Sequence, residues 1–393
     1  MIPKELLNKE VQEFIKAYRG SIPKLALKGN PFPAIPFPLL LQQIEGFHKA
    51  EKKLPTWAKH DNIVYPPKLN IEQTSSETTA AYKASLVNGE TLADLTGGFG
   101  VDTYYFSKSF KKIHHVEQNE VLSGIAHHNF TQFGIHHIQC INGNGLEYIK
   151  NQSFDVIYID PSRRHDAKGK VFFLKDCEPN IVEQLDFMLS KCKSLLLKTS
   201  PMLDISVGIS ELKNISEIHV VAVDNDVKEI LWKIQDNLSK AITIKTINFK
   251  GDAMQSFDFT YQGNALATFS IPKTFLYEPN AAILKAGAFN EISAFYGTDK
   301  LGVHSHLYTA DTLIDFPGRR FKVVDVLPYN KQSMKLLQGQ AANITTRNFP
   351  EQVTQIRKKW KIRDGGSNYL FFTTLESGER IVINTLKVDE KSL

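Results

Sequence analysis

Cysteine is scarce in this chain of 393 residues, which contains only Cys140, Cys177 and Cys192. Their spacing forms neither a C-x-x-C pair nor a zinc-ligand pattern, so we expect reduced thiols and a cytoplasmic location. Long apolar runs are also missing. No stretch approaches the roughly twenty residues that a membrane helix needs, and the first ten residues lack the apolar core of a signal peptide. These absences argue against secreted disulfide-rich and membrane-spanning proteins.

A metal site is not expected either. The twelve histidines include adjacent pairs such as His114-His115. Neighbouring side chains in a strand point to opposite faces of the sheet, so such pairs do not chelate one ion. Arginine is rare as well, with nine residues against thirty-eight lysines, yet two Arg-Arg pairs occur.

What the chain does contain is a series of short apolar runs, each followed by polar residues. Runs of this kind, spaced by potential helices, predict an α/β fold with a doubly wound parallel sheet. In such sheets the ligand binds beyond the carboxyl ends of the strands. The five runs are Leu92–Leu95, Ile113–Val116, Ile138–Ile141, Phe154–Ile159 and Ser194–Leu197.

The first run leads into a glycine-rich turn, T-G-G-F-G at 96–100, which opens a predicted helix with a candidate cap at Asp102. Glycine in such a turn lets the backbone approach a ligand closely. Glu117 ends the second strand, seventeen residues beyond Gly100, where an acid can bind both hydroxyls of a ribose. The turn lacks the G-x-G-x-x-G spacing, which argues against a dinucleotide-binding domain.

These landmarks resemble the class I S-adenosylmethionine-dependent methyltransferases. The resemblance implies a Rossmann-like sheet in which the turn holds the methionine part and Glu117 holds the ribose. Asn144 stands where the family places an Asp against the adenine, and Thr96 replaces the first glycine of the turn. The resemblance implies S-adenosyl-L-methionine as cofactor. The candidate cofactor residues are Gln73, Thr74, Asp94, Thr96, Gly97, Gly98, Gly100, Asp102, Glu117, Gln118, Asn144, Gly145 and Asp160.

Gln73 and Thr74 belong to the segment E-Q-T-S-S-E, which precedes the turn. Helix capping by Ser75 or Ser76 would alone explain the hydroxyl cluster. The segment also resembles a pre-motif of several RNA methyltransferase families, where it flanks the cofactor.

The fourth strand ends in D-P-S-R-R, which supplies the candidate catalytic residues Asp160, Arg163 and Arg164. Amino-group methyltransferases place an aromatic residue after the Asp-Pro pair, so stacking would need another residue, such as Phe172 or Phe173. The arginines suit a phosphate or carboxylate of the substrate, although an ion pair with Asp166 or Asp176 is the alternative. Ser200-Pro201 stands where a uracil-C5 enzyme would need its cysteine, which argues against that class.

Two further regions flank this domain. Helical periodicity over 5–18 and 39–52, separated by a proline-rich connection, predicts an N-terminal helical subdomain that serves for packing or as a lid. Residues 319–393 predict the order β-α-β-α-β-β. Gly318–Arg363 contains eleven Lys/Arg against two acids, a local charge of +9 in a chain of net +5. This charge fits nucleic acid or a solvated helix face. The candidate RNA-binding residues are Arg319, Arg320, Lys331, Arg357, Lys358 and Lys361.

Further motifs sharpen the resemblance. L-Y-E-P-N-A-A, R-R-F-K-V-V-D-V-L-P and R-D-G-G-S-N-Y-L resemble bacterial class I methyltransferases with a C-terminal THUMP-like domain. This resemblance implies methylation of RNA, either tRNA or rRNA, by direct in-line transfer. The alternatives are a methyltransferase acting on a small molecule or protein, and a catalytically inactive RNA-binding protein. The expected domains are helical 1–65, methyltransferase 66–262, small helical or ferredoxin-like 263–316, and basic α+β THUMP-like 317–393.

Overall fold

The computed structural model describes residues 2–163, 173–235 and 241–388. The chain divides into two compact units, of which the first comprises Met1–Ser216 with Ile230–Lys240 and the second Glu217–Glu229 with Ala241–Leu393. This division is coarser than the four domains expected from the sequence, whose boundaries stay a prediction. No helix within the described ranges is both long and apolar enough to cross a membrane.

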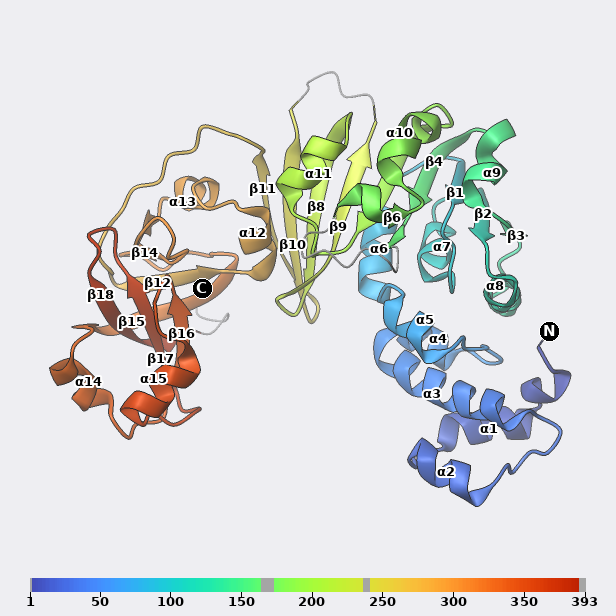
Figure 1. The fold of residues 1–393 in the computed structure, drawn as a ribbon, viewed down its shortest axis with the longest axis horizontal. Helices are drawn as coiled ribbons and strands as arrows, with labels where there is room; N and C mark the ends of the chain where they lie inside the picture. The colour runs from blue at the N-terminus through green and yellow to red at the C-terminus, as the bar shows by residue number, and fades with distance from the viewer. Residues whose placement is uncertain (1, 164–172, 236–240, 389–393) are drawn as a thin grey trace. The chain divides into compact units, whose positions relative to one another are not determined.

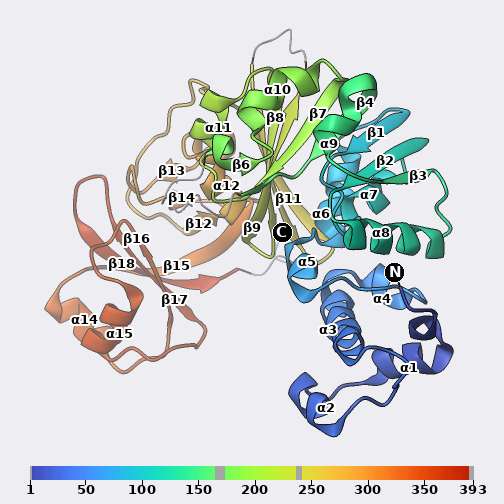
Figure 2. The ribbon, with the colours of Figure 1, turned by 45° about the vertical axis from the view of Figure 1, so that its right-hand side comes forward.

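The first unit begins with a group of helices, which Figures 1 and 2 show in blue. The segment expected as one helix over 5–18 is interrupted at Asn8, where extended backbone breaks the hydrogen-bond series. The cap expected at Ser75 or Ser76 is confirmed at Ser76, which precedes α6. These helices are η1 (Lys4–Leu7), α1 (Lys9–Ala17), α2 (Ile22–Lys28), α3 (Phe37–Lys53), α4 (Pro55–Lys59), α5 (Lys68–Gln73) and α6 (Glu77–Ser85).

The N-terminal helices are tied to the rest of the unit by polar and aromatic contacts. The side-chain amide of Asn129 binds both the N–H and the C=O of Val64, each at 2.9 Å. The indole ring of Trp57 lies 4.7 Å, centroid to centroid, from the ring of Phe99 in the glycine-rich turn. These contacts support packing as the role of the helices.

The sheet of the first unit confirms the expected doubly wound topology. Its parallel strands run in the order β3-β2-β1-β4-β7, and β9 pairs antiparallel with β7. The strands are β1 (Thr91–Asp94), β2 (Lys112–Glu117), β3 (Ile138–Asn142), β4 (Phe154–Ile159), β7 (Cys192–Thr199) and β9 (Asp226–Ile234). The connecting elements are α7 (Val101–Phe106), α8 (Glu120–Gln132), α9 (Gly145–Tyr148), η2 (Ile149–Asn151), β5 (Ser162–Arg163), η3 (Leu174–Asp176), β6 (Cys177–Glu178), α10 (Ile181–Leu189) and α11 (Ile205–Glu211).

The two histidines of β2 show that helices cover both faces of this sheet. The ring of His115 packs edge-on against Phe130 of α8, and its Nδ1 lies 3.0 Å from the hydroxyl of Thr103 in α7. Its neighbour His114 bonds instead to the hydroxyl of Tyr148 in α9, at 2.6 Å. The pair therefore points to opposite faces, as the strand period requires.

The second unit holds two groups of strands, coloured yellow-green to red in Figure 1. In the first group β8 (Ile215–Val223) pairs with β10 (Thr243–Lys250), which pairs with β11 (Ala253–Thr260). The turn after β8 places both Asp224 and Asn225 at positive φ, a region that Asp and Asn adopt more readily than most side chains.

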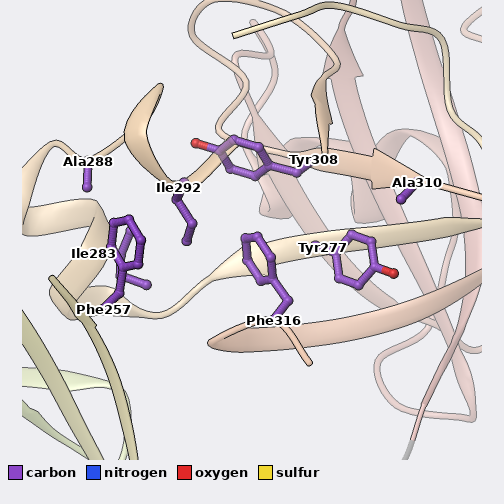
Figure 3. Packing of buried hydrophobic residues seen from close by; sticks show 8 residues of the cluster. All are labelled: Phe257, Tyr277, Ile283, Ala288, Ile292, Tyr308, Ala310 and Phe316. Carbon is purple, nitrogen blue, oxygen red and sulfur yellow. The ribbon is translucent and has the colours of Figure 1, made fainter. Parts of the chain in front are cut away.

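The second group is a seven-stranded sheet with the order β13-β14-β12-β15-β18-β17-β16. Aromatic and aliphatic side chains from its strands and from α12 and α13 form a common core, which Figure 3 shows around Tyr277, Tyr308 and Phe316. The segment after β12 forms two short helices, because Gly287 ends α12 in the left-handed region. These elements are β12 (Phe275–Pro279), α12 (Ala281–Ala286), α13 (Glu291–Tyr296), β13 (Asp299–Lys300) and β14 (Tyr308–Ala310).

The C-terminal part has the order β-α-β-α-β-β, so this prediction is confirmed. A buried cluster that includes Met334, Ile356 and Phe372 lies between its two helices and its strands. The elements are β15 (Gly318–Pro328), α14 (Lys331–Leu337), β16 (Asn343–Arg347), α15 (Val353–Trp360), β17 (Asn368–Thr374) and β18 (Arg380–Lys387).

Candidate active site

The glycine-rich turn between β1 and α7 forms the centre of the candidate site. Gly98 and Gly100 have φ values of 58° and 91°, in the left-handed region that side chains rarely adopt. A Cβ atom on Gly100 would also lie 2.5 Å from the ring of Phe130. A Cβ on Gly98 would meet nothing closer than 3.7 Å, so the space beside Gly98 is open. Gly100 therefore serves packing, while Gly98 leaves room for a ligand.

Glu117, at the carboxyl end of β2, faces this turn. Its Oε2 accepts the Gly98 N–H at 2.9 Å, and its Oε1 accepts the Asn119 N–H at 2.7 Å. An ionised carboxylate offers about four acceptor sites, so two remain for other donors. The backbone thus orients a half-buried carboxylate that can still accept two hydroxyl groups.

Asp94 ends β1 and is buried beneath the turn, with 1% of its surface exposed. It accepts hydrogen bonds from the Thr96 N–H at 3.1 Å and the Thr103 hydroxyl at 2.6 Å. Burial, together with the nearby carboxylates of Asp102 and Asp160, raises the pKa of Asp94 to about 7. Its protonation therefore changes near neutral pH.

Asp102, in the first turn of α7, is the acceptor of a buried polar network. Its Oδ2 accepts the Ser75 hydroxyl at 2.9 Å and the Tyr158 hydroxyl at 2.8 Å. Lys83 of α6 is fully buried, and its Nζ lies 3.3 Å from Oδ1 of Asp102. Burial alone would raise the pKa of Asp102, but Lys83 and then Lys198 hold it below its ordinary value. Asp102 is therefore a buried carboxylate held in its ionised form by lysine.

Asp160 follows β4 on the other side of the turn. Its N–H donates to the Thr96 hydroxyl at 2.7 Å, which joins the ends of β1 and β4. Its carboxylate forms an ion pair with Lys198, which lies near the end of β7. Asp160 is one-third exposed, at 34%, so it keeps access to solvent and to a substrate.

These elements enclose a cavity of about 130 Å³. Its described lining includes three carboxylates, Asp94, Asp102 and Asp160, and no lysine or arginine. Eight of the residues predicted as cofactor contacts line it: Gln73, Thr74, Asp94, Thr96, Gly97, Gly98, Asp102 and Asp160.

The other predicted cofactor residues lie outside that lining. The Asn144 oxygen accepts the N–H groups of Leu146 and Glu147, so it caps α9. Gly145 packs closely, because a Cβ there would lie 2.6 Å from the Leu95 carbonyl oxygen. Gln118 is exposed beside Glu117. Their roles toward a cofactor stay predictions.

Sequence reasoning missed several residues around the cavity. Ser76 is the helix cap of α6, accepting the Thr79 N–H, which leaves Ser75 to bind Asp102. Lys83, Tyr158 and Lys198 carried no predicted role. The sequence offered one indication of these residues: each is a polar side chain within a segment of apolar or small residues. In the structure all three act on the buried carboxylate of Asp102.

The predicted arginines after Asp160 can be placed only in part. Arg163 belongs to β5, whose backbone pairs with Glu178 and Cys177. The side chain of Arg163 lies outside the described part of the structure, as do Arg164, Asp166 and Phe172. Phe173 is half-buried, with the Lys175 ammonium 4.9 Å from its ring centroid.

The basic residues of the C-terminal part fall into two groups. Arg319 pairs with Glu278, Arg320 with Asp315, and Arg357 with Asp364. These guanidinium groups are thus held by acids of the same unit. The second group, Lys331, Lys358 and Lys361, is exposed to solvent. The predicted RNA contacts therefore rest more on the lysines than on the arginines.

Comparison with known proteins places the chain in a family. A ferredoxin-like domain family matches residues 275–317, and a THUMP domain-like family matches residues 318–386. No curated protein matched the sequence. The crystal structure of a candidate methyltransferase from Porphyromonas gingivalis W83 matches with TM-score 0.88 and 30% identity, over 99% of this chain and 100% of that chain. The chain belongs to the family of this Porphyromonas gingivalis protein.

Membership confirms the recognition made from the sequence, a methyltransferase fold with a C-terminal THUMP-like domain. Two other solved structures match part of the chain. M. capricolum TrmK in complex with S-adenosyl-homocysteine gives TM-score 0.32 and 17% identity, over 44% of this chain and 70% of that chain. M. jannaschii tRNA m1G37 methyltransferase gives TM-score 0.30 and 14% identity, over 42% of this chain and 51% of that chain. At these TM-scores neither adds to the family assignment.

Proposed function

We propose that this family member is an S-adenosylmethionine-dependent methyltransferase that modifies RNA, either tRNA or rRNA, in the cytoplasm. One observation carries the proposal. An acid-lined cavity lies at the carboxyl ends of β1 and β4, next to an open glycine turn whose backbone holds Glu117. Ligands of doubly wound sheets bind at this edge.

The residues at this edge fit the cofactor. S-adenosylmethionine carries a sulfonium and an ammonium group against one carboxylate, so it is a net cation. Of the three carboxylates around the cavity, Asp102 and Asp160 are paired with Lys83 and Lys198, so ionised Asp94 would supply the opposite charge. The two unused acceptor sites of Glu117 match the two hydroxyls of a ribose.

When bound, the cofactor supplies an activated methyl group for in-line transfer. The chain contributes positioning and exclusion of water, which together account for most of the rate in such reactions. Asp160 would hold the target group, since it is fixed by Thr96 and Lys198 yet remains partly exposed. Ser75, Lys83 and Tyr158 fix Asp102 in its ionised form behind the turn.

The first prediction concerns Glu117. We expect Glu117→Ala to weaken S-adenosylmethionine binding by about 2–3 kcal/mol, because hydrogen bonds to a charged acceptor are lost. Isothermal titration calorimetry checks this on the folded variant. Glu147→Ala, which removes an exposed acid of α9, the helix after the neighbouring strand β3, is the matched control and should leave the affinity unchanged. Unchanged affinity in folded Glu117→Ala would contradict the ribose assignment.

The second prediction concerns pH. Protonated Asp94 is neutral, and binding of a cation favours the ionised form. With a pKa of about 7 in the free protein, S-adenosylmethionine affinity should rise roughly tenfold from pH 6 to pH 8. Calorimetry at both pH values measures it. Asp94→Asn removes the titrating group, so S-adenosylmethionine affinity should become nearly independent of pH. An equally steep pH dependence in that variant would show that another group causes it.

RNA as substrate is supported by the C-terminal part of the chain. Its THUMP-like match, its local charge of +9 and its exposed lysines 331, 358 and 361 suit a polyanion. The experiment incubates purified protein with labelled S-adenosylmethionine and bulk RNA from a strain that lacks the gene. We expect label in tRNA or rRNA. Label only in protein or small molecules would favour a methyltransferase that acts on those substrates. Cofactor binding without any transfer would favour a catalytically inactive RNA-binding protein.

A further inference from the structure

A second cavity, of about 590 Å³, lies within the N-terminal helices of the first unit. It is formed by the end of α3, the start of α2 and one side of α5, which belong to the blue group of helices in Figures 1 and 2. We call it the basic cleft. Its lining residues are Gly20, Ser21, Ile22, Glu45, His48, Lys49, Lys52, Lys53, Lys68, Ile71 and Glu72.

Positive charge predominates in the basic cleft, which has four lysines against two glutamates. Lys49 uses its charge on Glu72, at 2.9 Å. Lys52 and Lys68 are exposed and form no ion pair within the part of the chain that the structure describes. Two ammonium groups are therefore left for an anion from outside the chain.

The cleft is a fixed feature of the fold. Lys53 reaches from α3 and donates to the carbonyl oxygens of Ile71 at 3.0 Å and Glu72 at 2.7 Å, which ties α3 to α5. The hydrogen bond from Lys49, and then the charges of Lys68 and Lys53, hold the pKa of Glu72 below its ordinary value. The lysines of both helices thus converge on one place.

One short helix links the basic cleft to the candidate active site. Lys68, Ile71 and Glu72 of α5 line the cleft, and Gln73 at the end of the same helix lines the acid-lined cavity. With a rise of about 1.5 Å per residue, Lys68 and Gln73 are separated by roughly 8 Å along the axis. An anion at Lys68 would therefore be close to a group bound in the cavity.

We propose that the basic cleft binds the phosphate backbone of the RNA substrate beside the nucleotide that enters the active site. The proposal rests on the proposed RNA methyltransferase function and adds a defined phosphate-binding site within the N-terminal helices. Lys52 and Lys68 contact phosphate, while Lys49 and Lys53 hold the helices in place. Contacts of this kind position an RNA without reading its sequence.

The test is a charge reversal at the two free lysines, Lys52→Glu with Lys68→Glu. The matched control reverses Lys24 and Lys28, two exposed lysines on α2 that do not line the cleft. Binding of a fluorescein-labelled single-stranded RNA of mixed sequence is followed by anisotropy at several salt concentrations. S-adenosylmethionine affinity is measured on every variant by calorimetry, which also reports that the active-site region is folded.

We expect the cleft variant to bind this RNA at least about tenfold more weakly than the control variant at low salt. The slope of log affinity against log salt concentration should be smaller in magnitude by roughly 1.4, because two phosphate contacts are lost. S-adenosylmethionine affinity should match that of the unaltered protein. Equal loss of RNA affinity in both variants would contradict phosphate binding in the basic cleft and would leave the proposed function intact. Unaltered protein that binds neither RNA nor S-adenosylmethionine would overturn both.

Discussion

Lys83→Met is expected to lower the free energy of unfolding of the first unit by about 3–5 kcal/mol. Lys83 is fully buried, and its ammonium lies 3.3 Å from the Asp102 carboxylate. Methionine of similar length would leave that carboxylate buried without its cation. Breaking a buried pair costs more than the pair contributes, because one charge remains uncompensated. Urea unfolding followed by tryptophan fluorescence, with Trp57 in this unit, measures the loss.

A second variant separates the charge effect from lost packing. Lys83→Met combined with Asp102→Asn removes both charges and should recover most of the stability. The pH dependence has a definite sign: without its lysine, buried Asp102 has a raised pKa, so the deficit of Lys83→Met should be small at pH 5 and grow as pH rises. A deficit below about 1 kcal/mol at pH 8 would contradict the role of the pair.

Asp160→Ala should abolish methyl transfer, with a loss of about 10²–10⁴-fold in rate, as for other groups that hold a reacting atom. Cofactor affinity should change by less than roughly tenfold, about 1.4 kcal/mol, because Thr96 still receives the backbone N–H. The assay is single-turnover transfer of labelled methyl to bulk RNA, with binding measured in parallel.

Asp186→Ala, which removes an exposed acid of α10, provides the control and should retain full activity. Asp160→Asn keeps an oxygen acceptor but removes the charge that pairs with Lys198. Partial activity in this variant would show that acceptance of a hydrogen bond matters more than charge. Equal losses of cofactor binding and transfer in Asp160→Ala would place Asp160 with the cofactor contacts instead.

The sheet and its central turn were predictable because each depends on local pattern. Short apolar runs ending in polar residues place Asp94, Glu117 and Asp160 at one edge of a parallel sheet without further information. The glycines of the turn show where the backbone must adopt positive φ. The C-terminal order was likewise predictable, since its helices and strands have clear hydrophobic periods.

Pairing across long sequence distances was not predictable. Ser75, Lys83 and Tyr158 meet Asp102 only when the chain folds, and no local pattern joins these positions. The same limit applies to Arg319. A surplus of basic residues suggested a nucleic-acid contact, whereas Glu278, forty-one positions earlier, engages its guanidinium group.

The helical segments show where local pattern misleads. A continuous helix was expected over 5–18, but extended backbone at Asn8 separates η1 from α1. The basic cleft could not be predicted from local pattern either. Its lysines belong to α3 and α5, and the tertiary contact made by Lys53 brings the two helices together.

The central claim is that the acid-lined cavity beside Gly98 is the cofactor site. A crystal structure of the protein with S-adenosylhomocysteine tests it most directly. We predict that the methionine part of the ligand lies against the Gly98 turn and that both ribose hydroxyls bind the Glu117 carboxylate. A ligand seated elsewhere, with Glu117 bound only to the N–H groups of Gly98 and Asn119, would contradict the account.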